Sequence, residues 1–169
     1  MEKSSVEAIL RVLSEHRVRY LIVGGLAVAA HGYLRFTADV DLVLSFDKDN
    51  LASALAAFRS LRYQPRAPVP IDDFLDPSKR EQWVKEKNMT VFSLFSPAHQ
   101  ATEIDVFVEP PFDFERAYAV AAPIEVAPGV TASFCSLDDL IALKTKAGRP
   151  RDLEDIVQLA KLREQKETK

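Results

Sequence analysis

Three aspartates in this sequence stand in settings that suit metal-dependent phosphoryl chemistry. Asp39 and Asp41 lie two residues apart in the stretch 38–46, where acidic and apolar residues alternate. In a strand both carboxylates leave the same face, with their Cα atoms about 6.5–7 Å apart. Asp105 stands in a second alternating stretch, 102–108, and joins that face if the two strands pair. Like charges this close are unfavourable unless a cation neutralises them, so we expect the three carboxylates to hold two Mg²⁺ ions about 3.5–4 Å apart.

A pair of glycines precedes these acids. Gly24-Gly25 follows a β-rich apolar run, 19–23, and precedes the Ala-rich segment 26–33. Glycines between a strand and a helix let the backbone approach a phosphate and aim helix amides at it. A strand-to-helix turn also uses glycine for structural reasons alone, and for Asp39 and Asp41 taken by themselves the solvated face of an amphipathic strand is the preferred interpretation. The phosphate-loop ending G-K-[ST] and the dinucleotide motif G-x-G-x-x-G are both absent here.

Basic side chains supply candidate contacts to phosphate. Lys144 shares a helical stripe with Leu137, Leu140 and Ile141, so it should point toward the interior or its edge. There a phosphate or a carboxylate would offset the free energy of burying its charge; the alternative is a lysine that snorkels at the core margin. Arg149 belongs to a basic segment that would steer a triphosphate or an RNA, or is a solvated basic turn.

Two residues before the acidic strand, and two acids near the C-terminus, extend the candidate site. Arg35 would bind phosphate or pair with an acid, and Thr37 would hydrogen-bond the glycine turn. Asp152 and Asp155 would orient Lys144 or Arg149, or would favour the N-terminus of the last helix. For Asp155 we prefer the second interpretation.

Apolar periodicity and turn residues predict the elements that position these side chains. We expect helices over 6–13, 26–33, 47–61, 81–87, 137–147 and from 150 onward, and strands over 19–23, 38–46, 90–95, 102–108, 124–126 and 131–134. The segment 64–77, rich in proline and aspartate, should be a loop. Gly148 should end one helix and Pro150 begin the next. The last helix should bury Leu153, Ile156, Val157 and Ala160.

Composition bounds the class of protein. The chain has 169 residues, 47% hydrophobic and 28% charged, which fits one α+β domain over 1–169, with a core at about 18–160 and a charged tail at 161–169. A net charge of −3 gives no global sign of a nucleic-acid binder. The single cysteine excludes an internal disulfide framework, and no apolar run reaches the roughly 18 residues of a membrane span. The N-terminus has no signal pattern, so we expect a cytoplasmic protein without membrane contact.

The combination of these motifs is more specific than its parts. A glycine pair, thirteen intervening residues, Asp39-Val40-Asp41-Leu42 and a later Ile104-Asp105-Val106 together resemble the DNA polymerase β-like nucleotidyltransferase superfamily. The sequence is most similar to its free-standing prokaryotic members, including the AbiE-type toxin nucleotidyltransferases, through Gly24-Gly25-Leu26-Ala27, His31-Gly32, Arg35-Phe36-Thr37-Ala38 and Leu143-Lys144…Gly148-Arg149…Asp152…Asp155-Ile156. The resemblance covers about 18–45, 102–108 and 136–160.

This resemblance implies a short mixed sheet flanked by helices, with C-terminal helices closing the cleft. It implies Mg²⁺-dependent transfer of a nucleoside monophosphate from an NTP to a hydroxyl acceptor. A tRNA end is the first expectation for the acceptor, with other RNA, a protein hydroxyl or a small molecule such as an aminoglycoside as alternatives. The toxin-like resemblance also implies a toxin–antitoxin role, with an antitoxin protein or a homodimer completing the cleft.

The roles follow residue by residue. We expect Asp39 and Asp41 to bridge two Mg²⁺ ions and Asp105 to bind the ion that activates the acceptor hydroxyl. We predict catalytic roles for Asp39, Asp41, Asp105 and Lys144, and nucleotide contacts from Gly24, Gly25, Arg35, Thr37, Lys144 and Arg149. Many superfamily members have Gly-Ser where this chain has Gly24-Gly25, so the serine hydroxyl that would touch the triphosphate is missing. A catalytically silent nucleotide-binding or toxin–antitoxin interaction module is therefore the alternative hypothesis.

Overall fold

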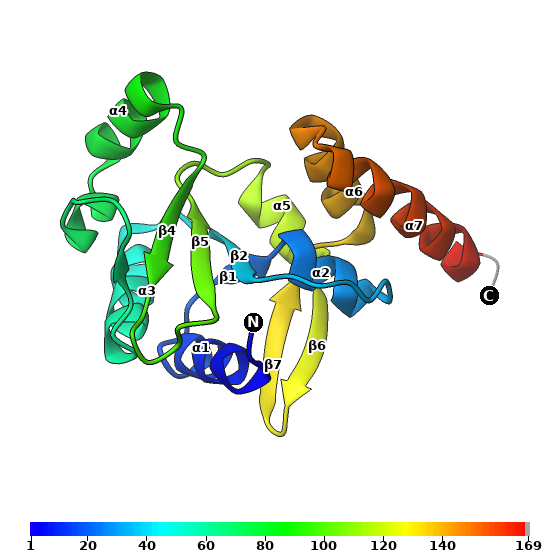
Figure 1. The fold of residues 1–169 in the computed structure, drawn as a ribbon, viewed down its shortest axis with the longest axis horizontal. Helices are drawn as coiled ribbons and strands as arrows, with labels where there is room; N and C mark the ends of the chain where they lie inside the picture. The colour runs from blue at the N-terminus through cyan, green and yellow to red at the C-terminus, as the bar shows by residue number, and fades with distance from the viewer. Residues whose placement is uncertain (168–169) are drawn as a thin grey trace.

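The computed structural model of the protein describes residues 1–167, in which helices surround a seven-stranded sheet (Figure 1). The helices are α1 (Lys3–Glu15), α2 (Gly24–His31), α3 (Lys48–Ser60), the 3-10 helix η1 (Ile71–Leu75), α4 (Pro77–Lys87), α5 (Phe114–Ala119), α6 (Leu137–Ala147) and α7 (Pro150–Glu167). The strands are β1 (Tyr20–Ile22), β2 (Asp39–Leu44), β3 (Gln64–Pro65), β4 (Val91–Phe95), β5 (Glu103–Phe107), β6 (Ala122–Ala127) and β7 (Val130–Phe134). The predicted class, a mixed sheet flanked by helices, is confirmed.

The sheet has the strand order β3-β4-β5-β2-β1-β7-β6 and contains both strand orientations. β2 pairs in parallel with β5 and antiparallel with β1, while β1 pairs in parallel with β7. The acid-bearing strands β2 and β5 are therefore direct neighbours near the middle of the sheet. Segments more than 60 residues apart in sequence meet there.

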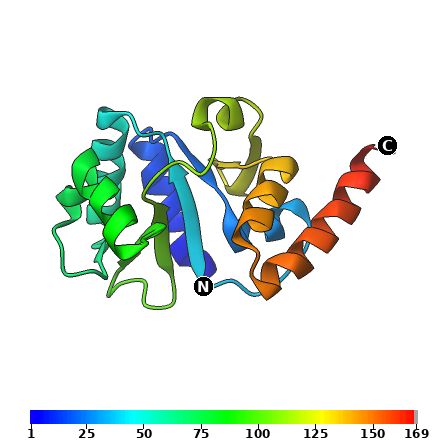
Figure 2. The same cartoon turned by 90° about the horizontal axis from the view of Figure 1, so that it is seen from above.

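Alternation along β2 explains why one face of this strand is core. Val40, Leu42 and Leu44 are fully buried, whereas Asp39 and Asp41 on the opposite face are partly exposed. Helix α1 packs against α3 and β7. Figure 2 shows α3 and α4 at one end of the molecule and the α6–α7 pair at the other, beside α2. The sheet thus carries apolar packing on one side and leaves the acids open toward α2 and the C-terminal helices.

Local structure differs from prediction in three segments. The expected loop 64–77 contains the edge strand Gln64–Pro65 and the 3-10 helix Ile71–Leu75. An edge strand tolerates proline because its missing N–H faces no neighbouring strand. Helix α4 begins at Pro77, earlier than predicted, because the Asp76 side chain caps it. The short helix Phe114–Ala119 was not predicted from the sequence, although it is also capped by an aspartate.

The prediction for the buried stripe of α7 is wrong for Leu153 and Val157, which are 58% and 52% exposed, whereas Ile156 and Ala160 are half-buried. Among the described side chains of this helix, the fully buried ones are those of Asp152, Asp155 and Leu159. These three lie at i, i+3 and i+7, so they share one face of the helix. The acids can be buried because basic side chains neutralise them there.

The C-terminal helix also runs further than predicted. Helix α7 continues to Glu167, through most of the segment expected to be a charged tail, and residues 168–169 lie outside the described part. No helix within residues 1–167 is both long and apolar enough to cross a membrane. The predicted turn between α6 and α7 is confirmed: Gly148 has φ +62° and Pro150 is the first residue of α7.

Candidate active site

The three predicted aspartates meet on one face of two paired strands. The register of β2 and β5 places Asp41 directly opposite Asp105, and Asp39 opposite Glu103. Directly opposite residues of paired strands project to the same face of a sheet. All three aspartate side chains are partly exposed. The structure therefore places on one face the carboxylates that the sequence pattern singled out.

Mutual repulsion and partial burial shape the electrostatics of this face. Burial, together with the charges of Asp105 and Asp39, raises the pKa of Asp41 to about 7. Burial, followed by the charges of Asp105 and Glu103, also raises the pKa of Asp39. Ser93, on the antiparallel neighbour β4, donates a hydrogen bond of 2.5 Å from its hydroxyl to Oδ1 of Asp105. This serine was missed by sequence reasoning because only the β4–β5 register identifies it.

The glycine turn lies directly beneath Asp41. Gly24 has φ +63°, and a Cβ at that position would lie 1.9 Å from Oδ2 of Asp41. The backbone N–H of Gly25 donates a hydrogen bond to the Asp41 carboxylate, which opposes the rise in its pKa. Val23, the N-cap of α2, contributes no capping side chain. The first turn of α2 therefore has the Asp41 carboxylate of the adjacent strand as its anionic partner. Position 24 requires glycine because the backbone there has a positive φ and because a side chain would collide with Asp41.

The donor set suits a hard cation. Asp39, Asp41 and Asp105 offer only carboxylate oxygens, the ligands that Mg²⁺ prefers, and their mutual repulsion would be relieved by positive charge. In the described residues, however, no three acidic, histidine or cysteine side chains converge closely enough to form a metal site as they stand. Asp41 is turned toward the glycine turn and Asp105 toward Ser93. The chemistry of the residues fits Mg²⁺, while two of the three side chains are engaged by protein groups.

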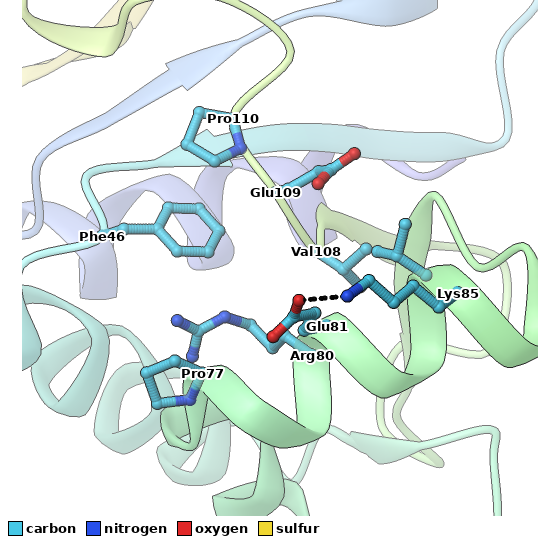
Figure 3. A pocket seen from close by; sticks show the side chains of 9 residues that line it. Phe46, Pro77, Arg80, Glu81, Lys85, Val108, Glu109 and Pro110 are labelled. Carbon is cyan, nitrogen blue, oxygen red and sulfur yellow. Dashed lines mark hydrogen bonds and ion pairs between the residues drawn. The ribbon is translucent and has the colours of Figure 1, made fainter.

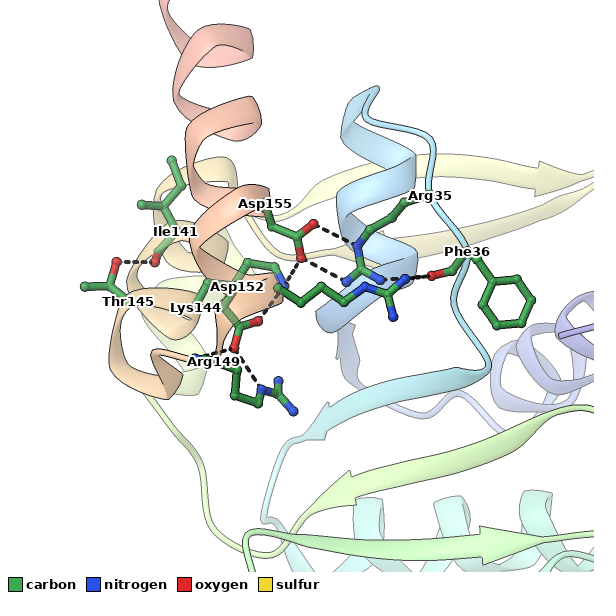
Figure 4. Close-up of polar contacts among 9 residues, drawn as sticks. Arg35, Phe36, Ile141, Lys144, Thr145, Arg149, Asp152 and Asp155 are labelled. Carbon is green, nitrogen blue, oxygen red and sulfur yellow. Dashed lines mark hydrogen bonds and ion pairs between the residues drawn. The ribbon is translucent and has the colours of Figure 1, made fainter.

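Helices α6 and α7 bring a buried charge cluster to the same face (Figure 4). Nζ of Lys144 lies 2.6 Å from Oδ2 of Asp155 and 3.1 Å from Oδ1 of Asp152, and its side chain is only 5% exposed. Nε of Arg149 lies 2.8 Å from Oδ2 of Asp152. The positive charge of Lys144 opposes the rise in the pKa of Asp41, so the cluster interacts electrostatically with the carboxylate face. Of the two partners considered for Lys144, the carboxylates are the ones that it contacts.

Arg35 and Thr37 approach this cluster and the glycine turn from the loop before β2. Arg35 contacts Asp155 twice, with Nε 2.8 Å from Oδ1 and Nη2 2.9 Å from Oδ2. The hydroxyl of Thr37 donates to the carbonyl oxygen of Asp39 at 3.4 Å, and not to the glycine turn as predicted. An acid is thus the observed partner of Arg35.

The preferred interpretation of Asp155 is wrong. Asp155 lies beyond the first turn of α7, where the helix dipole has little effect, and it bridges Arg35 and Lys144 instead. Asp152 does lie in the first turn, and it also holds Lys144 and Arg149. Although burial raises the pKa of Asp152, hydrogen bonds from Arg149 and Lys144 leave it below its ordinary value. Both acids therefore position basic side chains.

Two further residues lie at the margin of the site. His31 is buried at the end of α2, and its Nε2 lies 2.8 Å from the carbonyl oxygen of Cys135, a contact that ties α2 to the end of β7. Cys135 is fully buried. Burial raises the pKa of its thiol to about 12, which makes it a poor nucleophile.

A separate hollow of about 350 Å³ lies between α4 and the ends of β2 and β5 (Figure 3). Its walls include Phe46, Arg80 and Val108. The Arg80 guanidinium stacks 4.9 Å from the centroid of the Phe46 ring and donates to the carbonyl oxygen of Phe74, so it ties α4 to η1. None of the predicted site residues lines this hollow. The carboxylate face is a distinct surface.

Comparison with solved structures supports the fold. The chain is similar to an antigenic nucleotidyltransferase-like protein from Paracoccidioides brasiliensis, with a TM-score of 0.59 and 19% identity, covering 95% of this chain and 75% of that one. It is also similar to the antibiotic-resistance factor ANT(2'')-Ia in solution, with a TM-score of 0.58 and 17% identity over 94% and 81% of the two chains. The crystal structure of ANT(2'')-Ia in complex with adenylyl-2''-tobramycin is similar with a TM-score of 0.55 and 15% identity, covering 94% of this chain and 86% of that one. At these identities the likeness establishes the fold.

Sequence comparison supplies the family. None of the curated proteins matches the chain. The family model described as the nucleotidyl transferase AbiEii toxin of type IV toxin–antitoxin systems matches residues 8–169. This match includes the glycine turn, the three aspartates and the charge cluster of α6 and α7. The protein therefore belongs to the AbiEii family of nucleotidyltransferases, as its resemblance to the DNA polymerase β-like superfamily indicated.

Proposed function

We propose that this nucleotidyltransferase uses Mg²⁺ to transfer a nucleoside monophosphate from an NTP to a hydroxyl acceptor, and that it is the toxin of a toxin–antitoxin pair. The observation that carries the proposal is the direct pairing of Asp41 with Asp105, beside Asp39 and above the Gly24-Gly25 turn. Three carboxylates and a helix N-terminus on one open face suit a metal-bound triphosphate. The family description supports the toxin role.

Each group has a proposed task. Asp39, Asp41 and Asp105 would hold two Mg²⁺ ions, which supply neutralisation of phosphate charge and activation of the acceptor hydroxyl. Asp105 would accept the proton of that hydroxyl. The amides of the glycine turn would bind the β- and γ-phosphates, because a helix N-terminus favours anions.

Basic residues of the C-terminal helices place positive charge close to the carboxylates of this site. Lys144 and Arg149 lie on the C-terminal helices, and each has an electrostatic interaction with Asp41. We propose that they contact the triphosphate, with Asp152 and Asp155 holding them in position. Arg35, held by Asp155, would contribute positive charge at the glycine turn.

The acceptor and the partner belong to the same proposal. We take an RNA 3′ hydroxyl, such as a tRNA end, as the first acceptor to test. A protein hydroxyl and an aminoglycoside are the alternatives; ANT(2'')-Ia, a neighbour in fold, has been solved with an adenylyl-tobramycin. An antitoxin protein is the expected partner, since the family is one of type IV toxin–antitoxin systems.

Label transfer tests the activity and the acceptor together. The protein is incubated with each of four α-³²P-labelled NTPs, Mg²⁺ and cell lysate, and the products are divided into RNase-sensitive, protease-sensitive and small-molecule fractions. We expect label in the RNase-sensitive fraction, no transfer in EDTA, and a loss of at least about a hundredfold in Asp39→Ala, as removal of a group that stabilises transition-state charge typically causes.

Asp113→Asn is the matched control for this assay. Asp113 is exposed and caps α5, and asparagine caps a helix equally well, so transfer should be unchanged. Transfer that survives Asp39→Ala at the wild-type rate would rule out the proposed site. Tight binding of ATP that is independent of Mg²⁺, without any transfer, would favour the silent nucleotide-binding module instead.

A further inference from the structure

The hollow between α4 and the ends of β2 and β5 contains a buried positive charge that has no acidic partner. Arg80 lines this hollow of about 350 Å³ and is only 9% exposed. Within residues 1–167, its guanidinium makes one hydrogen bond, from Nη1 to the carbonyl oxygen of Phe74, and it forms no ion pair with an acid. Arginine is almost never buried this far unless an anion accompanies it. The arrangement therefore points to an anion that comes from outside the chain.

Aromatic rings hold the Arg80 guanidinium in a fixed orientation at the hollow (Figure 3). Its central carbon lies 4.9 Å from the centroid of the Phe46 ring and 5.7 Å from that of Phe74. Neither Nε nor Nη2 belongs to the fully enclosed, unpaired polar atoms of the described residues, so both keep access to the hollow. A guanidinium that is stacked on one side and open at its edge suits a planar carboxylate, which can accept two parallel hydrogen bonds.

The protein itself compensates this charge poorly. Burial lowers the pKa of Arg80, and the charge of Asp76 opposes that effect from a distance. The Asp76 side chain caps α4, where Oδ1 accepts a hydrogen bond of 2.8 Å from the backbone N–H of Ser78. A carboxylate that enters the hollow would replace the hydration lost by the guanidinium with charge-assisted hydrogen bonds.

The rest of the wall restricts the kind of anion. Glu81 and Lys85 form an ion pair with each other on the exposed surface of α4, so their charges cancel. Glu109 is exposed and has no ion pair within the described chain, and its charge would repel a polyphosphate. The apolar part of the wall consists of Phe46, Pro77, Val84, Val108 and Pro110. These features together favour a ligand with one negative charge and an apolar body.

We infer that this hollow binds a small organic acid, with its carboxylate on Arg80 and its apolar body between Val84 and Val108. A volume of about 350 Å³ lies near the lower end of the range for ligand pockets, so a ligand with a single ring fits better than a nucleotide. The site does not depend on the proposed function, because no residue of the carboxylate face lines it.

An NMR titration of the ¹⁵N-labelled protein tests the inference, with benzoate as the probe. We expect benzoate to shift the backbone amide signals of Phe46, Arg80, Val84 and Glu109 and to saturate them at millimolar concentration, as suits a ligand of few atoms. Benzamide, its neutral isostere, should bind at least about tenfold more weakly, because the charge-assisted hydrogen bonds are lost. Inorganic phosphate, which has charge but no apolar body, should give no saturable shift.

Two variants test the site from different walls of the hollow. Arg80→Met removes the charge and should weaken benzoate binding at least about tenfold. Val84→Phe leaves Arg80 in place and fills the hollow from a partly exposed position of α4, so it should weaken binding by a similar factor. The matched controls are Arg11→Met, on the exposed face of α1, and Val120→Phe, at an exposed position after α5. Both should bind benzoate within about twofold of the wild type.

The outcomes separate a ligand site from a structural arginine. If Arg80 serves only to tie α4 to the carbonyl oxygen of Phe74, benzoate will not bind in the hollow, and Val84→Phe will behave as the wild type does. Val84→Phe decides the question alone if Arg80→Met does not fold. Shifts that do not saturate, shifts centred on other residues, or equal affinities in Val84→Phe and the wild type would overturn the inference. Phosphate that binds as tightly as benzoate would overturn the assignment to an organic acid. Failure of nucleotidyl transfer would leave this result unchanged.

Discussion

Replacing Asp41 by asparagine should stabilise the metal-free protein, and more so at high pH. Burial and two neighbouring charges raise the pKa of Asp41 to about 7, from about 4 in an unfolded chain. The contribution of this carboxyl group to stability is therefore fully present below about pH 4 and is lost as the pH rises through about 7. A shift of about 3 pKa units corresponds to at most about 4 kcal/mol.

Solvent screening reduces that upper bound. Because Asp41 is partly exposed, we take about half of the upper bound of about 4 kcal/mol. We therefore expect Asp41→Asn to raise the free energy of unfolding by about 2 kcal/mol at pH 8 and about 1 kcal/mol at pH 5. The asparagine carbonyl can still accept the Gly25 N–H, so the cap of α2 is retained. The residue that we propose as a metal ligand is thus one that destabilises the metal-free fold at neutral and alkaline pH.

Urea unfolding in EDTA at pH 5 and pH 8 measures both values. Asp113→Asn, at an exposed helix cap, should differ from the wild type by less than about 0.5 kcal/mol at either pH. Adding Mg²⁺ at pH 8 should stabilise the wild type more than Asp41→Asn, because a cation that binds the native state shifts the unfolding equilibrium. A variant that is less stable than the wild type at pH 8, or a gain that is the same at both pH values, would refute the electrostatic reasoning.

Four further substitutions test the surroundings of the site. Lys144→Met should lower the free energy of unfolding in urea by about 3 kcal/mol, because each of two buried carboxylates loses one of its two basic partners; a loss below about 1 kcal/mol would contradict this. Gly24→Ala should abolish NTP binding in calorimetry, since its methyl group would meet the Asp41 carboxylate and the φ of +63° is unfavourable by about 1–2 kcal/mol. Leu159→Ala should lower the free energy of unfolding by about 2–5 kcal/mol, because Leu159 is buried, whereas Leu153→Ala should change it by less than about 0.5 kcal/mol, because Leu153 is exposed. Equal effects of the two substitutions would contradict the observed orientation of α7.

The sequence predicted best what depends on near neighbours in the chain. Alternation in 38–46 and 102–108 identified both acid-bearing strands, because successive side chains of a strand point to opposite faces. Gly148 and Pro150 marked the turn between α6 and α7 for an equally local reason. The 3.6-residue pattern of α7 failed, because apolar spacing cannot reveal that a helix buries acids instead.

Distant contacts decided the rest of the candidate site. Asp155 faces Arg35, 120 residues away in the chain, and no local pattern announces that pair. Ser93 reaches Asp105 only because β4 and β5 pair in one particular register. The close approach of Thr37 to Gly25, where an added Cβ would lie 2.6 Å from the Thr37 hydroxyl oxygen, depends likewise on how the loop before β2 folds back over α2.

The sequence by itself determined the chemistry that is available: three carboxylates on strands, a glycine turn that opens a helix, and a lysine on an otherwise apolar stripe. It did so because side-chain direction follows from the short repeat of a strand or a helix. Only the tertiary structure decided which of these groups touch. Strand register and helix packing set Asp41 against both Asp105 and the glycine turn, and they set Lys144 between two acids. Those contacts join segments far apart in the chain, and their energies depend on the packing of the whole sheet.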